Sequence, residues 1–155
     1  DPDEPVAYFN LGAMLYTSGH KVEAAQRYLE AKERYPVGSE DWAKATAQVF
    51  DLLRQEECSE VAKPEWWNDE ELKALSARVV RAAPNEVCAH SMRAVVLTGA
   101  CGGSLVAGPR STVELKDAAT YFDRAEALCH APAVKAAFAC AAKACRAARQ
   151  VPCKA

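Results

Sequence analysis

The chain has 155 residues, half of them hydrophobic, with 19 basic and 21 acidic residues and a formal net charge of −2. This length and apolar content predict a single domain, 1–155, that buries a core, and they exclude global disorder. The apolar runs are far shorter than the roughly 20 residues of a membrane-spanning helix, so we expect that the chain does not span a membrane. Alanine is abundant and β-branched residues are sparse, which favours an all-α fold.

The stretch 5–38 predicts a helical hairpin. On both sides of Gly19 its apolar residues recur at the i, i+3, i+4 and i+7 spacing of amphipathic helices. We expect the first helix over 6–18 and the second over 21–35, ending before Pro36 because proline cannot continue a helix.

Small and aromatic residues occupy fixed positions in this hairpin. Gly12 and Ala24 fall where the two helices would cross closely, and Tyr8, Leu11 and Tyr28 would fill the space beside the crossing. The full set is Tyr8, Leu11, Gly12, Leu15, Ala24, Tyr28 and Pro36. This register resembles the tetratricopeptide repeat (TPR), a hairpin unit of about 34 residues. The resemblance implies an α-solenoid in which the first helix of each hairpin lines a concave, protein-binding groove.

A second unit is predicted over 39–86. The spacing of the first unit recurs 34 residues later, in Trp42, Ala45, Thr46 and Val49. We expect a helix over 39–54, capped by Ser39, and a helix over 69–83 that begins at an Asn68–Glu71 capping box. Between them lies an insertion, 55–69, where a tight turn would be expected.

A third unit is predicted over 87–131, with a helix over 87–99. An insertion rich in glycine, 100–110, reads as a flexible loop, and a Ser111–Glu114 capping box opens the next helix. That helix repeats the spacing of the second one: Ala118, Phe122 and Ala125 follow the pattern of Ala24, Tyr28 and Ala31.

Pro132 opens a last helix, predicted over 133–150, that would cap the array, since terminal repeats need a polar outer face. Its expected inner face is Val134, Ala137, Phe138, Ala141 and Cys145, and its basic face is Lys135, Lys143, Arg146 and Arg149. We therefore predict about three TPR-like hairpins and a C-terminal capping helix (132–150).

Charge is uneven along the chain. Residues 1–86 hold 17 acidic and 10 basic residues, a net charge of −7, whereas residues 87–155 hold 4 acidic and 9 basic residues, a net charge of +5. The basic last helix would then be either a solvated face or a docking face for an acidic protein, a membrane surface or nucleic acid. Nucleic acid fits poorly, because the basic stretch has no aromatic residues on which bases could stack.

The sequence shows no catalytic motif, so we predict a protein that is not an enzyme and needs no cofactor. The seven cysteines are odd in number and have no C-x-x-C pair, which favours reduced thiols in a reducing intracellular compartment. Cys88 with His90, and Cys129 with His130, are incomplete as metal ligand sets. The first residues lack the features of a signal peptide, so we expect a processed product or a fragment whose targeting segment is absent or removed.

The groove implied by the resemblance would be lined one step around from the packing face of each first helix. The predicted residues are Phe9, Ala13, Tyr16, Thr17, Ala47, Phe50, Asp51, Ser91, Val95 and Thr98. Exposed Phe9, Tyr16 and Phe50 would mark an interaction site; the alternative is that these rings pack on a neighbouring helix. TPR domains that clamp the acidic tails of heat-shock chaperones use Lys, Asn and Arg at these positions. Here the residues are Phe9, Ala13, Cys88 and Met92, so a more apolar peptide or a helix fits better.

Trp66 and Trp67 in the first insertion are a second candidate contact, because Trp is favoured at binding hot spots. The alternative is that the insertion packs back on its own repeat. We therefore predict a non-catalytic scaffold or adaptor that binds another protein. Two alternatives stay open: a subunit built permanently into a larger complex, and a substrate-recognition domain of a multidomain enzyme.

Overall fold

The computed structural model describes residues 3–102, 105 and 107–148. Within these residues the chain forms helices and no strand, which confirms the predicted all-α class. The helices are α1 (Pro5–Thr17), α2 (Lys21–Arg34), α3 (Glu40–Leu53), the short 3-10 helix η1 (Glu56–Cys58), α4 (Asp69–Ala82), α5 (Val87–Thr98), α6 (Thr112–Leu128) and α7 (Pro132–Ala148). The bounds of α1 to α5 agree with the predicted ones to within one residue.

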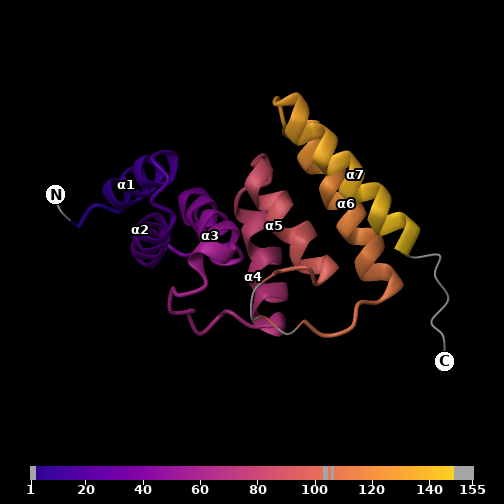
Figure 1. Cartoon of the computed structure of the whole chain (residues 1–155), viewed down its shortest axis with the longest axis horizontal. Helices are drawn as coiled ribbons and strands as arrows, with labels where there is room; N and C mark the ends of the chain where they lie inside the picture. The colour runs from indigo at the N-terminus through magenta and orange to yellow at the C-terminus, as the bar shows by residue number, and fades with distance from the viewer. Residues whose placement is uncertain (1–2, 103–104, 106, 149–155) are drawn as a thin grey trace.

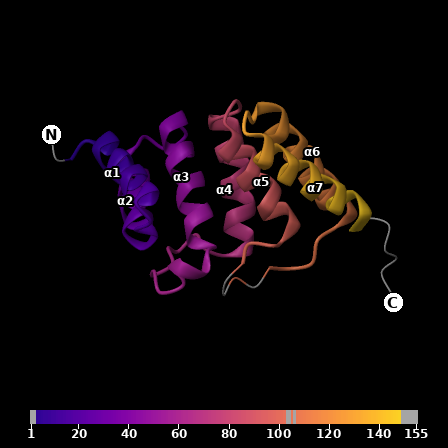
Figure 2. The same cartoon turned by 45° about the horizontal axis from the view of Figure 1, so that its top comes forward.

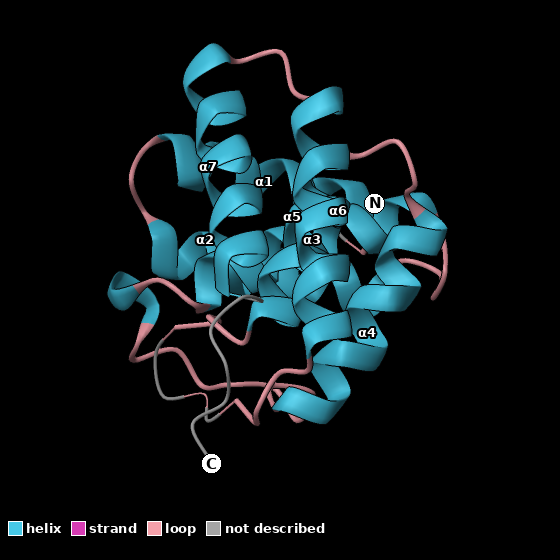
Figure 3. Ribbon diagram, turned by 90° about the vertical axis from the view of Figure 1, so that its right-hand side faces the viewer, coloured by secondary structure: helices cyan, strands magenta, loops and turns pink. Residues whose placement is uncertain are grey.

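The helices follow one another along the long axis of the molecule (Figure 1). Each α-helix contacts the next one in sequence, and α3 also contacts α5. The view turned by 45° shows the same order, with α1 and α2 at one end and α6 and α7 at the other (Figure 2). Figure 3 views the molecule from the end at which α7 lies and shows helices joined by loops.

The core is deepest around α3. This helix buries nine residues, among them Trp42, Phe50 and Leu53. Trp42 is 2% exposed, and two cations lie over its ring, with Lys32 Nζ 5.7 Å and the Arg78 guanidinium carbon 5.2 Å from the ring centroid. Ser39 caps the helix as predicted, because its side chain accepts a hydrogen bond from the backbone N–H of Trp42.

The first hairpin crosses closely at Gly12, as predicted. A Cβ atom at this position would lie 3.0 Å from the Tyr28 ring, which is tighter than ordinary van der Waals contact. The prediction for Leu11 is wrong, however: its side chain is 42% exposed instead of filling the crossing. The physical reason is that Leu11 lies on the side of α1 that faces away from α2.

Helices α2 and α6 bury the same pattern of residues. In α2 these are Ala24, Ala25, Tyr28 and Ala31, and in α6 they are Ala118, Ala119, Phe122 and Ala125. The Ser111–Glu114 capping box of α6 is present in both directions. The residue spacing that α6 shares with α2 therefore places the same kinds of side chain in the core of both helices.

The described residues of 100–110 form a loop, as predicted, and the end of this loop is anchored to the neighbouring helices. The Arg110 side chain is 5% exposed and donates hydrogen bonds to both carboxylate oxygens of Asp69, at 2.5 and 2.9 Å. It also donates to the backbone carbonyls of Val96 and Leu97 at the end of α5, at 2.8 and 3.2 Å. Arg110 thus joins α4, α5 and the start of α6.

Helix α7 packs against α6, and its predicted inner face is confirmed for Phe138, Ala141 and Cys145. Ala142 and Cys145 are buried and the Phe138 ring lies 6.3 Å from that of Phe122. Val134 is 44% exposed, and Ala137 is also exposed, because both lie off the α6 side of the helix. The prediction is therefore wrong for Val134 and Ala137, and the buried Ala142 was not predicted.

The four residues predicted to form a basic face on α7 do not share one environment. Lys135 is half-buried and donates to the backbone carbonyl of Glu126, at 3.2 Å, so it points toward α6. Arg146 pairs with Asp123 of α6. Lys143 is exposed, and Arg149 lies outside the described residues.

Candidate functional site

Helices α3, α5 and α7 line a cavity of about 260 Å3. Its floor and walls are Ala47, Gln48, Phe50, Asp51 and Arg54 from α3 and its C-cap, Val87, Cys88, Ser91, Met92 and Val95 from α5, and Phe138 from α7. The lining residues thus come from three α-helices that are not consecutive in the chain.

A second cavity of about 380 Å3 is adjacent to the first. Arg54 and Val95 line both cavities. The remaining residues come from the end of α5, from α6 and from α7: Thr98, Ala100, Leu115, Phe122, Ala141, Ala144, Cys145 and Ala148. Because the two cavities share side chains, we describe them as one groove, the α3–α5–α7 groove.

The groove has an apolar floor and a polar edge. Phe50, Met92 and Val95 are 1%, 2% and 9% exposed and form much of the floor. The charged residues among those that line the two cavities are Asp51 and Arg54, and they pair with each other at 3.2 Å. The surface of the groove is therefore mostly apolar, and its one negative and one positive side chain neutralise each other. Such a surface suits an uncharged or apolar segment of a ligand.

Cys88 is the thiol in the first cavity. Burial, reinforced by the negative charge of Glu86, raises the pKa of this thiol to about 11. Since only the thiolate is strongly nucleophilic, Cys88 is protonated and unreactive at neutral pH.

Six of the predicted groove residues come together in the α3–α5–α7 groove: Ala47, Phe50, Asp51, Ser91, Val95 and Thr98. The expectation that Phe50 is exposed is wrong, because its ring is buried as part of the floor. The four predicted residues of α1 line neither cavity. Of these, Phe9 packs edge-on against Tyr28, with ring centroids 5.2 Å apart, while Ala13 is half-buried and Tyr16 and Thr17 are exposed.

The contribution of α7 to the groove was not predicted. A capping role was expected for this helix, whereas Phe138, Ala141 and Cys145 line the groove. Arg54 and Gln48 were also missed, because polar residues near the end of a helix give no distinctive pattern.

The Trp66–Trp67 pair supports the groove from behind. Trp67 is 9% exposed, and its ring centroid lies 5.7 Å from that of Phe50 and 5.9 Å from that of Trp66. Trp66 is half-buried, with Lys32 Nζ 5.2 Å from its ring centroid, and burial lowers the pKa of Lys32. The insertion thus packs back on its own repeat, which is the second of the two predicted alternatives.

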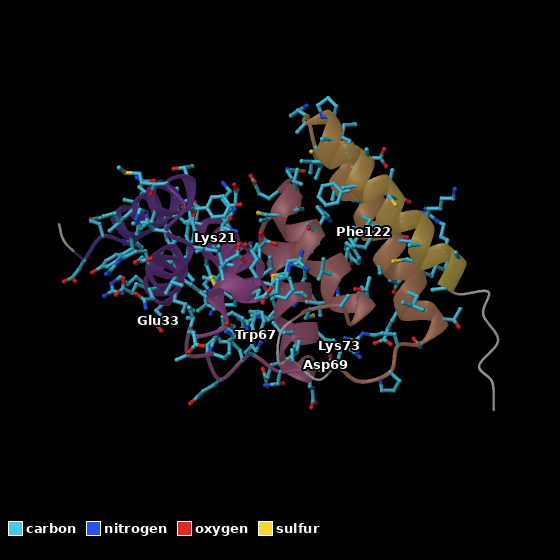
Figure 4. All side chains as sticks on the ribbon, viewed as in Figure 1. Lys21, Glu33, Trp67, Asp69, Lys73 and Phe122 are labelled. Atoms are coloured by element: carbon cyan, nitrogen blue, oxygen red, sulfur yellow. The ribbon has the colours of Figure 1, made fainter. Side chains whose placement is uncertain are left out.

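The second insertion closes over the end of α4. Figure 4 shows Asp69 and Lys73 on α4 beside the loop that leads into α6. The hydrogen bonds from Arg110 lower the pKa of Asp69 to about 2. Lys73 pairs with Glu114 at 2.6 Å, and this contact, with the backbone of Ser111, lowers the pKa of Glu114 to about 2. Both carboxylates are used to hold the loop.

Among the described residues, no three or more His, Cys, Asp or Glu side chains are placed to hold a metal ion, and the six described cysteines are free thiols. No helix in the described part of the chain is both long and apolar enough to cross a bilayer. Compared with protein-family models and with curated proteins, the chain matches none of them.

Proposed function

We propose that this protein is a non-catalytic interaction module, a scaffold or adaptor that binds an apolar peptide or helix of another protein in the α3–α5–α7 groove. The observation that supports this function is the pair of adjacent cavities with a buried apolar floor and paired charges. Concave apolar sites with a few polar groups at the edge are the usual form of ligand sites.

We also propose that the helices form a TPR-like α-solenoid of three hairpins and a further helix. Three observations support this architecture. The first-helix pattern recurs at an offset of 34 residues. The close crossing occurs at Gly12, and α2 and α6 bury equivalent residues. In such an array the first helices line one face, which matches the helices that line the groove.

The chemistry of the groove narrows the ligand. Arg54, the cation that lines it, is already paired with Asp51, so a carboxylate-clamped chaperone tail is not the ligand that we propose. An apolar side chain of the ligand would enter the first cavity over Phe50 and Met92, and its backbone would meet the polar groups of Gln48 and Ser91. This is recognition by apolar anchors, as in helix-in-groove complexes.

The test is selection of peptides from a random library displayed on phage, with the 155-residue chain as bait. Selected peptides are synthesised, and their affinity is measured by isothermal titration calorimetry against three variants. Ser91→Trp fills the first cavity and Thr98→Trp obstructs the second. Thr120→Trp is the matched control, because Thr120 is an exposed residue of α6 that lines neither cavity.

We expect peptides with apolar residues at regular spacing, whose affinity falls at least tenfold in the Ser91→Trp variant and is unchanged in the Thr120→Trp variant. Circular dichroism verifies that the variants fold. Peptides that bind all three variants with equal affinity would place the ligand site elsewhere. Failure to select any peptide that competes for the groove would favour the alternative of a permanently assembled subunit.

A further inference from the structure

The first helix leaves a large apolar face without a neighbour in the described chain. None of the 13 residues of α1 is charged. The helix packs on α2, and on its other side Val6, Leu11 and Met14 are 48%, 42% and 68% exposed. An exposed cluster of large apolar side chains is typical of an interaction surface. We call Val6, Leu11 and Met14 the head face.

The last described helix has a complementary free face at the other end of the molecule (Figure 1). α7 packs on α6, and its opposite side carries small exposed residues and one lysine. These residues, which we call the tail face, are Ala133, Ala136, Cys140, Lys143 and Ala147. None of them lines the α3–α5–α7 groove.

The two faces match in size. The head face offers long, flexible side chains, and the tail face offers a helix surface made mostly of alanine. Small residues allow a second helix to approach closely, so that bulky side chains from that helix fill the space between the two backbones. Two head faces would bring bulky residues against each other, and two tail faces would leave little apolar area to bury.

The charge distribution also favours contact between a head face and a tail face. Residues 1–86, which include the head face, have a net charge of −7, and residues 87–155, which include the tail face, have a net charge of +5. Helix α7 itself has three basic residues and no acidic one. Like-charged ends repel and oppositely charged ends attract, so electrostatics favours contact between a head and a tail.

We propose that the protein self-associates head to tail, with the head face of one copy packed against the tail face of α7 in a second copy. Such a contact is heterologous, and each copy that joins still has one face free. Because α1 and α7 lie at opposite ends of the molecule (Figure 1), copies join into open chains that lengthen with concentration. The grooves stay accessible in such a chain. The proposal does not depend on what the groove binds.

The test is sedimentation velocity of the 155-residue chain over a concentration series, in reducing buffer so that Cys140 cannot form a disulfide. We expect the weight-average mass to rise from the 16.8 kDa monomer to more than twice that value as concentration increases. The association should weaken in 1 M salt, because screening shortens the range of the attraction.

Three substitutions to glutamate identify the faces. Met14→Glu blocks the head face and Ala136→Glu blocks the tail face. Val113→Glu is the matched control, because Val113 is 66% exposed on α6 and belongs to neither face. Glutamate is a good helix former, and circular dichroism verifies that each variant retains its helices.

We expect the Met14→Glu and Ala136→Glu variants to remain monomeric separately and to form a one-to-one dimer when mixed, since each retains the face that the other has lost. The control variant should associate like the wild type. A wild-type dimer that Met14→Glu abolishes and Ala136→Glu leaves intact would show head-to-head pairing and overturn the proposal. A monomer at every concentration, as would result if another protein covers these faces, would overturn it too.

Discussion

Helices α1 and α3 have the same pattern of small and aromatic residues at an offset of 34, yet they are buried very differently. α3 buries nine residues and α1 buries one, Gly12. Trp42 of α3 is 2% exposed, whereas the equivalent Tyr8 of α1 is half-buried beneath the Arg34 guanidinium. The difference comes from neighbours: α3 contacts α2, α4 and α5, while α1 packs on α2. Burial in this fold therefore depends on the position of a helix in the series as well as on its pattern.

Truncation of the two equivalent aromatic residues should have the largest effect. We expect Trp42→Ala to lower the free energy of unfolding by about 3–5 kcal/mol, since it leaves a cavity beneath Lys32 and Arg78. Tyr8→Ala should cost about 1 kcal/mol, because much of its ring already contacts solvent. Urea denaturation followed by circular dichroism measures both values.

Equal losses in these two variants would contradict the comparison, because they would mean that α1 is as tightly held as α3. A suitable control is Tyr16→Ala. Its side chain is 44% exposed and lies on α1 at a position that the repeat pattern does not use. We expect its cost to be within about 0.5 kcal/mol of zero.

A smaller effect should follow from making α1 resemble α3 at the helix crossing. Thr46 occupies the α3 position equivalent to Gly12 and is fully buried there, with its hydroxyl donating to the Trp42 carbonyl at 2.7 Å. In α1 the same side chain would collide with the Tyr28 ring, 3.0 Å from the added Cβ. We therefore expect Gly12→Thr to cost about 1–3 kcal/mol.

A double-mutant cycle with Tyr28→Leu separates this collision from a general effect on the helix. We expect the double variant to be more stable than the sum of the single losses predicts, by at least about 1 kcal/mol, because leucine leaves room for the threonine. Additive losses would show that Tyr28 is not the obstacle at the crossing.

The number, type and bounds of the helices could be predicted from the sequence, because apolar spacing, caps and prolines are local signals. Ser39 and Ser111 each cap a helix as predicted, and Asn68 caps α4 through the N–H of Glu71, which is one half of its predicted capping box. The groove was predictable in part, since six of its residues follow from the repeat spacing.

What could not be predicted depends on contacts between distant segments. Phe50 is buried because Trp67, from the insertion, packs against it. The second insertion is anchored because Arg110 meets Asp69, a residue 41 positions away. Leu11 is exposed and α7 lines the groove for the same kind of reason: spacing within a helix does not state which neighbours that helix will have.

The smallest effect that we predict compares ion pairs in the middle and at the end of the molecule. Asp69 and Arg110 have side chains 20% and 5% exposed, whereas Arg27 and Glu30 of α2 are both 36% exposed. We expect Asp69→Asn to lower the free energy of unfolding at pH 7 by about 1–2 kcal/mol. Glu30→Gln, the matched control at the exposed pair, should cost no more than about 0.5 kcal/mol.

The pH dependence of this loss follows from the pKa of Asp69. Because Arg110 lowers that pKa from 3.8 to about 2 in the folded protein, the pair stabilises the fold fully above about pH 5 and loses its contribution as the pH falls toward 2. The difference in unfolding free energy between wild type and Asp69→Asn should therefore shrink steadily over that range. A difference that is the same at pH 7 and pH 3 would mean that the carboxylate acts through its shape and hydrogen bonds, and that its charge does not anchor the loop.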